Sequence, residues 1–325
     1  MTFSRKVKLS ITTIALGLAL AIISGCATGG NQIAGVNQNP EFSSMAKPAH
    51  ANNIASRSVE EIGKDGDASP LSGNELETLG DTYFANGNLP SAFMNYEKAL
   101  RINPKNARVL YKKGLVLLSA GLYEDAEKIF VHLCHQDPRN ALAHEGLGRT
   151  YFLMRRYDDA KHAFQKAVEL DSSLWASYNI LGIIYDNQKE YEAALSEYRK
   201  ALSLRPNEGM LYHNLGVSYS LAGKYKESVE AFRVALMKGY RESRIYNSLG
   251  LSLSKLGLYD EAFEAFRAGG NAASAYNNIG FIYLNDGNYD KAAECFEKAI
   301  ASSAEFYARA NENLKTARAY SQRVQ

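Results

Sequence analysis

The sequence predicts an all-α fold, a solenoid of seven stacked helix pairs followed by a capping helix. The main observation is a fixed spacing, because six glycines lie 34 residues apart and a seventh follows after 30. They are Gly80, Gly114, Gly148, Gly182, Gly216, Gly250 and Gly280. A period of about 20–50 residues is typical of stacked repeats, in which each unit buries its apolar face on its neighbour.

The residues around each glycine predict two helices. In the fourth unit Tyr178, Gly182 and Tyr185 recur at spacings of three and four, so they share one helix face. Ala194 and Tyr198 do the same on a second helix. Because Gly182 and Ala194 are small, the two helices can approach closely while the tyrosines fill the space beside them.

Prolines and a second set of glycines predict where the helices end. Proline cannot continue a helix, so the second helices should stop before Pro104, Pro138 and Pro206. Other glycines fall between the two helices of a unit, where a turn needs positive φ. They are Gly87, Gly121, Gly223, Gly257 and Gly287.

This pattern, from about Gly73 to Phe306, resembles the tetratricopeptide repeat, a helix–turn–helix of 34 residues. The resemblance implies a right-handed superhelical solenoid of about seven tetratricopeptide helix pairs plus a C-terminal capping helix. The expected repeats are 73–106, 107–140, 141–174, 175–208, 209–242, 243–272 and 273–306. Repeat six is short, ending at Gly269-Gly270-Asn271, which should change the local rise or twist. Residues 307–325 are expected to form the polar-faced capping helix and a tail.

The N-terminus has the features of a secretory signal peptide. Three basic residues precede an apolar run, 9–23, that is too short for a comfortable membrane span of about 20 residues. Ile23-Ser24-Gly25-Cys26 resembles the lipobox of bacterial lipoproteins. The resemblance implies cleavage after residues 1–25, lipidation of Cys26 and, from Ala27, sorting to the outer membrane, facing the periplasm. An uncleaved anchor or an ordinary secretory peptide is the alternative. Residues 26–72 are rich in Asn, Ala, Ser and Gly and predict a lipidated cysteine followed by a flexible tether.

Composition argues against nucleic-acid binding and catalysis. The formal charge is +2, but without Arg5, Lys6 and Lys8 the 37 basic residues become 34, against 35 acidic ones. No basic face for nucleic acid is implied. The sequence holds no phosphate-binding loop after a strand, no zinc-binding histidine pair and no nucleophile elbow. We therefore expect no enzyme, no cofactor and no small-molecule substrate.

A row of asparagines suggests a protein-binding groove. The resemblance implies that the first helix of each pair lines a concave face. The residues expected to point into that groove are Asn179, Asp186, Asn187, His213, Asn214, Asn247, Lys255, Asn277, Asn278 and Asn285. An asparagine amide both donates and accepts, so it can pair with a peptide backbone without reading sequence. The interpretations are an extended or helical partner segment along repeats four to seven, or asparagines that merely solvate the inner face.

Two other sets of residues were considered as sites. Repeats one to three carry Glu77, Asp81, Arg108, Lys112, Glu145 and Arg149 at inner positions. They could bind a second partner, but a solvated charged face is the simpler interpretation. His132, Cys134 and His135 have spacings that do not place all three on one helix face, which argues against a metal site. Cys134 and Cys295 lie in distant repeats and are expected to be packed thiols.

Among lipidated repeat proteins, the chain is most similar to the assembly lipoproteins of the tight-adherence (Flp) pilus, TadD type. The similarity rests on lipobox, tether, repeat number and the stretch 275–283 after the short repeat. It implies a non-enzymatic scaffold for a pilus or secretion apparatus. The alternatives are a pilotin for a type IV pilus secretin, or an adaptor of outer-membrane protein assembly or of cell-wall hydrolases.

Overall fold

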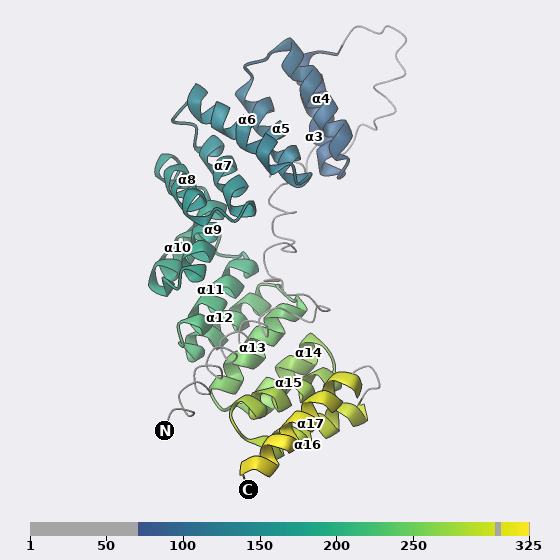
Figure 1. Cartoon of the computed structure of the whole chain (residues 1–325). Coiled ribbons are helices and arrows are strands. Elements are labelled where there is room, and N and C mark those ends of the chain that lie inside the picture. Colours follow the sequence, from purple (N-terminus) through teal and green to yellow (C-terminus); the bar gives the residue numbers. More distant parts are fainter. Residues whose placement is uncertain (1–70, 303–306, 325) are drawn as a thin grey trace, which may run out of the picture. The chain divides into compact units, whose positions relative to one another are not determined.

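A computed structural model describes residues 71–302 and 307–324, and in these residues it contains fifteen helices and no strand (Figure 1). The first helices of the pairs are α3 (Gly73–Ala85), α5 (Ala107–Ser119), α7 (Ala141–Leu153), α9 (Trp175–Asn187), α11 (Gly209–Leu221), α13 (Ser243–Lys255) and α15 (Ala272–Asn285). The second helices are α4 (Leu89–Ile102), α6 (Tyr123–Gln136), α8 (Tyr157–Leu170), α10 (Tyr191–Leu204), α12 (Tyr225–Met237), α14 (Tyr259–Gly269) and α16 (Tyr289–Ser302), and α17 (Tyr307–Val324) follows. The expected signal peptide, Cys26 and nearly all of the tether lie outside the described residues.

The described residues fall into two compact units, 71–184 and 185–324, which divide within α9. Each unit is a stack of helix pairs in which a second helix also packs against the first helix of the next pair. The all-α helical-repeat fold predicted from the glycine spacing is confirmed.

Six glycines of the series admit an aromatic ring from the second helix of their own pair. A Cβ built on Gly80, Gly114, Gly148, Gly216, Gly250 or Gly280 would lie 2.5–2.9 Å from a ring carbon of the residue sixteen positions later. Those rings belong to Tyr96, Phe130, Phe164, Phe232, Phe266 and Phe296, and each is at most 1% exposed. Since real Cβ atoms do not approach this closely, only glycine permits the contact.

A second small residue lies four positions before each ring. It is alanine in six repeats and Ser228 in the fifth, and all seven are fully buried. Ser228 does not leave its hydroxyl unpaired, because Oγ donates to the Gly216 carbonyl oxygen at 2.7 Å. Close helix packing is therefore retained with a polar atom in the core.

Prolines end the second helices as predicted. Helices α4, α6 and α10 end two residues before Pro104, Pro138 and Pro206. Asn106 and Asn140, which follow the first two of these prolines, then cap the next first helices by accepting backbone N–H bonds at 3.3 and 3.1 Å.

The turns within the pairs require a left-handed residue, and the five glycines predicted there have φ of 75–78°. In repeats three and four the same position holds Arg155 and Lys189, with φ of 61° and 62°. The backbone hydrogen bonds are nevertheless the same, because Arg155 N donates to Phe152 O at 3.0 Å as Gly87 N donates to Phe84 O. These two turns therefore carry backbone strain that the glycine turns do not.

Repeat six is shortened at its second helix, since α14 has 11 residues. A Cβ on its last residue, Gly269, would meet Tyr246 Cβ at 2.8 Å and the Ser243 carbonyl oxygen at 3.0 Å. Asn271 then starts α15 through a capping box with Ser274. Helix α14 can therefore end early because Gly269 has no side chain where its backbone comes close to α13.

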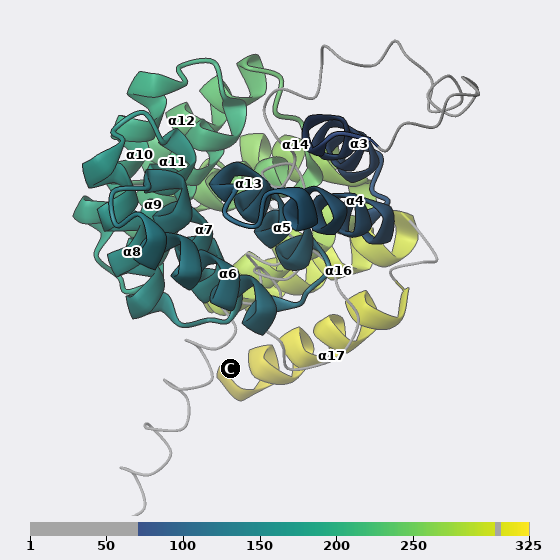
Figure 2. The same cartoon turned by 90° about the horizontal axis from the view of Figure 1, so that it is seen from above.

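Helix α17 packs along α16 (Figure 2). It also touches α15. Ala310, Leu314 and Ala317 form its buried stripe. Leu314 stands 34 residues after Gly280, where a further repeat would have its glycine. Asn313 donates to Asn277 Oδ1 at 3.1 Å, so α17 also covers part of α15.

The glycine–aromatic contact predicts a large effect from one methyl group. Gly216→Ala should lower the free energy of unfolding by ~1–3 kcal/mol, because the new Cβ would overlap the Phe232 ring. Urea denaturation followed by circular dichroism measures it. Gly73→Ala is the matched control, since its Cβ would meet nothing closer than 3.8 Å. Equal effects at both positions would contradict the packing assignment.

The strained turn predicts a stabilising substitution. Arg155→Gly should raise the free energy of unfolding by ~0.5–1 kcal/mol, because relief of a left-handed L-residue, about 1–2 kcal/mol, exceeds the entropic cost of glycine. Gly121→Ala, at the matching turn of repeat two, should be destabilising. Thermal melts of the two variants should move in opposite directions, and a lower melting temperature for Arg155→Gly would refute the strain.

Candidate protein-binding surface

Side chains on successive first helices contact one another, and we call this set the first-helix row. In residues 71–184 it contains Glu77, Asp81, Arg108, Lys112, Glu145 and Ser177. In residues 185–324 it contains Asp186, Ser218, Ser220, Ser252, Asn277 and, on α17, Asn313. The row is charged in the first unit, and in the second its only charged member is Asp186.

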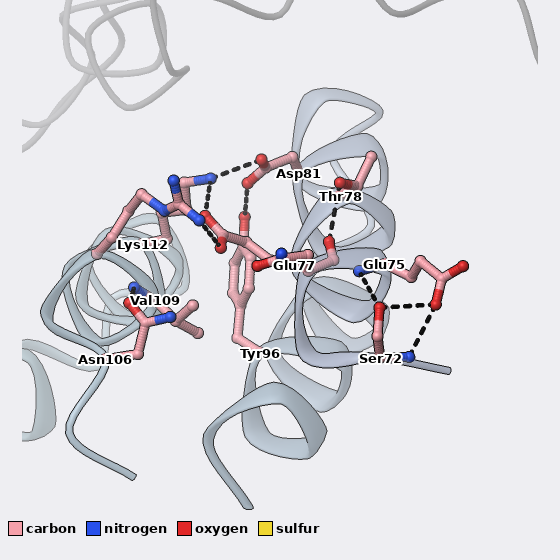
Figure 3. Close-up of polar contacts among 11 residues, drawn as sticks. Ser72, Glu75, Glu77, Thr78, Asp81, Tyr96, Asn106, Val109 and Lys112 are labelled. Carbon is pink, nitrogen blue, oxygen red and sulfur yellow. Dashed lines mark hydrogen bonds and ion pairs between the residues drawn. The ribbon is translucent and has the colours of Figure 1, made fainter. Parts of the chain in front are cut away.

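Glu77 is the centre of an ion-pair cluster between α3 and α5 (Figure 3). Its carboxylate accepts from Arg108 Nη2 at 2.7 Å and from Lys112 Nζ at 2.6 Å, and Lys112 also bonds Asp81 at 2.6 Å. Burial by itself would raise the pKa of Glu77, but the hydrogen bonds from Lys112 and Arg108 hold that pKa below its ordinary value. Glu77 is therefore ionised at neutral pH.

Asp81 is also held by a tyrosine from the second helix of its own pair. Tyr96 Oη donates to Asp81 Oδ1 at 2.6 Å, and burial together with this carboxylate raises the pKa of the phenol. The ring that packs on Gly80 thus extends its polar end to the first-helix row (Figure 3). The same residue, Tyr96, therefore packs the two helices together and holds Asp81 of the row in position.

A second charged group lies deeper in the same unit. Arg149 Nη2 donates to Glu145 Oε1 at 3.0 Å, and Ser177 Oγ from α9 donates to the same oxygen at 3.3 Å. Burial disfavours the charged guanidinium, yet Glu145 raises the pKa of Arg149 above its ordinary value. Both side chains are at least 90% buried.

The prediction of a solvated charged face on repeats one to three is therefore wrong. Glu77, Glu145 and Arg149 are buried, and Asp81 and Lys112 are partly buried. The physical reason is that the acids and bases pair with each other, between α3 and α5 for the Glu77 cluster and within α7 for Glu145 and Arg149. Arg108, whose side chain is 65% exposed, is the member of the Glu77 cluster that remains accessible.

In the second unit Asp186 is held by hydroxyl groups. Ser218 Oγ of α11 donates to Asp186 Oδ1 at 2.7 Å, and Tyr198 Oη of α10 donates to Oδ2 at 2.9 Å. Burial raises the pKa of this carboxyl to about 6, against the opposing effect of the two hydrogen bonds. Among the salt bridges of the described helices, none involves Asp186.

Hydroxyl groups continue into the next repeats. Ser228 and Ser252 are 2.9 Å apart between their Oγ atoms, and Ser252 reaches Ser220 at 3.4 Å. Ser228 and Ser252 are fully buried. The second unit thus places neutral polar groups where the first unit has ion pairs.

The predicted groove residues differ widely in exposure. Asn187, Lys255 and Asn285 are exposed, whereas Asp186, Asn214, Asn247, Asn277 and Asn278 are partly buried. Asn277 accepts its hydrogen bond from α17, as described above. The structure brings Asn214 beside His213, with Asn214 Oδ1 at 3.3 Å from His213 Nδ1.

Two of the ten residues do not point into an open groove, which corrects the prediction for them. Asn179 is fully buried, because α9 is apolar and every residue from Ala176 to Gly182 is buried. His213 is 7% exposed, with its ring 5.6 Å from that of Phe232 and 5.3 Å from that of Tyr240. Burial lowers the pKa of His213 to about 4, so the imidazole is neutral at pH 7.

Sequence reasoning missed the pairing of tyrosines with acids. The aromatic position of the second helix holds tyrosine only in repeats one and four. These are also the repeats in which a first helix carries an aspartate, Asp81 or Asp186, that the tyrosine reaches. A Tyr in place of Phe, in a repeat whose first helix carries an Asp, was a readable signal, although Asp81 and Asp186 lie at different positions of the repeat.

The cysteines and histidines of repeat two form no cluster. His132 and His135 are exposed, and Cys134 Sγ instead lies 3.7 Å from His144 Nδ1. Cys134 and Cys295 are unpaired, and burial raises the pKa of the Cys134 thiol to about 11. Within residues 71–302 and 307–324, no three His, Cys, Asp or Glu side chains are placed to hold a metal ion.

A hollow of the second unit lies apart from these residues. A pocket of about 760 Å³ is lined by residues of α11 and α12 and of the α13–α14 turn, among them Tyr212, Val229 and Leu258. None of the ten predicted groove residues lines it.

Asp186 predicts a distinctive pH dependence of stability. Its folded-state pKa of about 6 lies above the ordinary 3.8, so its favourable contribution is present below about pH 4 and is lost as pH rises through about 6. Asp186→Asn is neutral at every pH. The wild-type free energy of unfolding minus that of the variant should fall by up to ~3 kcal/mol between pH 4 and pH 7.5. Urea titrations at several pH values measure this difference, and parallel curves would refute the assignment.

No helix in the described part of the chain is long and apolar enough to cross a membrane. Solved structures similar in fold include a tetratricopeptide repeat protein from Parabacteroides merdae and the Cut9–Hcn1 hetero-tetramer of the APC/C. The first has a TM-score of 0.52 at 19% identity and covers 75% of this chain and 98% of that chain. The second has a TM-score of 0.54 at 20% identity and covers 79% of this chain and 50% of that chain. MamA is 30% identical over 50% of this chain and 94% of its own, with a TM-score of 0.44.

No curated protein sequence matches this chain. Family models do match, and together they cover most of the described helices. A model described as TPR repeat matches residues 80–121, and models described as tetratricopeptide repeat match residues 145–209, 214–276 and 273–302. These matches agree with the helix pairs and their glycine–aromatic contacts. The chain belongs to the tetratricopeptide-repeat family.

Proposed function

We propose that this protein is a non-enzymatic, lipid-anchored scaffold that binds a partner protein along the first-helix row of residues 185–324. It would serve the assembly of a pilus or secretion apparatus of the tight-adherence (Flp) type in a bacterial cell envelope. The single observation that carries the binding proposal is the neutral polar character of this row in the second unit.

Neutral polar side chains support the binding of a protein backbone. Asn214, Asn247 and Asn278 lie on α11, α13 and α15, the helices that also carry Ser218, Ser252 and Asn277 of the row, and all three are partly buried. Amides both donate and accept, as a peptide backbone does. Stacked repeats commonly use such extended surfaces for proteins, and the Cut9–Hcn1 structure is a hetero-tetramer.

The first unit supports a different role. Its row is occupied by its own ion pairs, and a partner would have to replace charge-assisted hydrogen bonds at Glu77 and Glu145. Such a replacement is costly, since leaving one buried charge unpaired costs several kcal/mol. We assign partner binding to the second unit and spacing from the anchor to the first.

The lipid anchor and its location are supported by the N-terminal sequence. Basic residues, a short apolar run and the lipobox-like Ile23-Ser24-Gly25-Cys26 occur in the order that lipoprotein processing requires. A single acyl chain binds a membrane only marginally, so the three chains of a mature lipoprotein would be needed for stable anchoring. We place the protein at the outer membrane, facing the periplasm.

The assignment to a pilus or secretion apparatus rests on the resemblance to tight-adherence lipoproteins. In-cell photocrosslinking from position 214 tests it, with the captured protein identified by mass spectrometry. Capture of a pilin or of another pilus-assembly protein, with or without a secretin, is the expected result. Capture of a cell-wall hydrolase or of a β-barrel assembly subunit would favour the adaptor function, and capture of a secretin alone would favour the pilotin.

Lipidation makes a separate prediction. Cys26→Ala should abolish acyl labelling and move the protein from the membrane fraction to a soluble or unprocessed form. Metabolic labelling with a fatty-acid probe, followed by fractionation, measures both. Ser24→Ala is the control, because alanine should preserve the small-residue character of the cleavage region. Continued acyl labelling of Cys26→Ala would refute the anchor.

The asparagines make a third prediction. Asn214→Ala combined with Asn278→Ala should weaken binding of the captured partner by ~30-fold, at about 1 kcal/mol for each lost hydrogen bond. Isothermal titration calorimetry measures the affinity, and circular dichroism should show unchanged helicity. Asn207→Ala is the control, since Asn207 is an exposed asparagine between α10 and α11. Undiminished affinity of the double variant would exclude the asparagine row as the binding surface.

A further inference from the structure

The acids of the first helices follow a rule with one exception. Beyond the first helical turn, the seven first helices contain four acids, which are Glu77, Asp81, Glu145 and Asp186. Each of the first three pairs with an Arg or Lys of the same or the next first helix, at 2.6–3.0 Å. Asp186 has only the hydroxyls of Ser218 and Tyr198.

The comparison with Asp81 shows what is missing. Both aspartates accept a hydrogen bond from the tyrosine on the second helix of their own pair. Asp81 also has Lys112 of the next first helix, as Figure 3 shows. Asp186 lies three positions later in its repeat than Asp81 does, because the register of Asp81 is held there by Ile183. Lys112 follows Asp81 by 31 residues, whereas the residue 31 positions after Asp186 is Val217, and α11 contains no Lys or Arg at all.

Neighbouring groups do not replace that cation. His213, the titratable nitrogen-bearing side chain of α11, is neutral because burial lowers its pKa to about 4. On α10, Arg199 donates to Tyr219 Oη and Lys200 pairs with Glu197. The raised pKa of Asp186, about 6, is what a carboxyl group has when burial is not compensated by a counter-charge.

The carboxylate is nevertheless oriented, and it has unused acceptor positions. Each of its oxygens accepts one hydroxyl hydrogen bond, and a carboxylate has about four acceptor positions in all, so room for further donors remains. Asp186 is partly buried, not enclosed. It sits in the row of the second unit that is otherwise neutral, so a cation arriving there meets no competing acid of that row.

We propose that Asp186 is the binding site for a lysine or arginine side chain of the protein segment that occupies the first-helix row. The inference rests on the proposed binding function and adds the chemistry of the partner to it. The neutral amides bind the backbone of the segment without reading its sequence, and Asp186 fixes its register by accepting one cation. The partner thereby supplies the charge that Lys112 supplies to Asp81 within the chain.

The test uses the full-length protein in detergent and a phage-displayed library of random 12-residue peptides. Selections are run in parallel on wild type, on Asp186→Asn and on Asp81→Asn. Peptides selected by wild type should share a Lys or Arg at one fixed position, and that preference should vanish with Asp186→Asn. Asp81→Asn is the matched control, because its tyrosine-bonded carboxylate already has a cation, and it should select the same peptides as wild type.

A synthetic peptide from the wild-type selection then allows a double-mutant cycle. Replacing its cation by Gln, or Asp186 by Asn, should each weaken binding about tenfold or more, and the two changes together should weaken it no further. The peptide substitution leaves the protein untouched, so the result holds even if Asp186→Asn were to fold poorly.

The outcomes separate this inference from the proposed function. Peptides that share a sequence but no cationic position, or a cation preference that survives in Asp186→Asn, would overturn the role of Asp186 and leave the binding function standing. Additive effects of the two changes in the double-mutant cycle would also overturn the role of Asp186 and leave the binding function standing. Failure of wild type to select any peptide would overturn both.

Discussion

The structure depends on one contact, which is the aromatic ring of each second helix seated on the glycine of its first helix. Because the rings are buried and the glycines have no side chain, the two helix axes approach more closely than any other residue would allow. Repetition of the contact at the same register orients every first helix alike within a unit. Side chains on consecutive first helices then meet at sequence separations of 31–35 residues, close to the repeat length, which is how the first-helix row arises.

The two units use that row for different purposes. In residues 71–184, charges of opposite sign compensate each other between helices, so the row contributes to cohesion and specificity of stacking. In residues 185–324, hydroxyls and amides take those places, and the one acid has no counter-charge within the described helices. Both units are built from the same kind of helix pair. The ion pairs of the first unit stabilise the stack, whereas the neutral polar groups of the second unit are the ones proposed to bind a partner. The tyrosine that replaces phenylalanine in two repeats is the side chain that connects the helix packing to the row.

Much of the fold could be predicted because the repeat encodes it locally. Glycine, alanine and tyrosine at helical spacing predict the helix pairs, and Pro104 or Pro206 predicts where a second helix ends. The binding surface was harder to predict, because the exposure of a side chain depends on neighbouring side chains that the 34-residue spacing does not specify. His213 has the register of a groove residue, but Phe232 and Tyr240 enclose it. Asn179 is buried by the apolar character of its own helix. The backbone strain at Arg155 was not predicted either. The turn keeps the hydrogen bonds of the glycine turns, so the strain lies only in the positive φ of Arg155.

Leu314 has a consequence for how such a protein can change in length. It occupies the glycine register of α17 and is buried among Ala292, Phe296 and Ala317. A second helix added after α17 could not seat its aromatic ring there, because the leucine side chain fills the space that glycine leaves open. Duplication of a 34-residue segment ahead of α17 would meet no such obstacle, since each earlier pair presents a glycine to its own ring. Lineages of this protein should therefore gain or lose repeats internally while inheriting α17 as a fixed terminus of the stack.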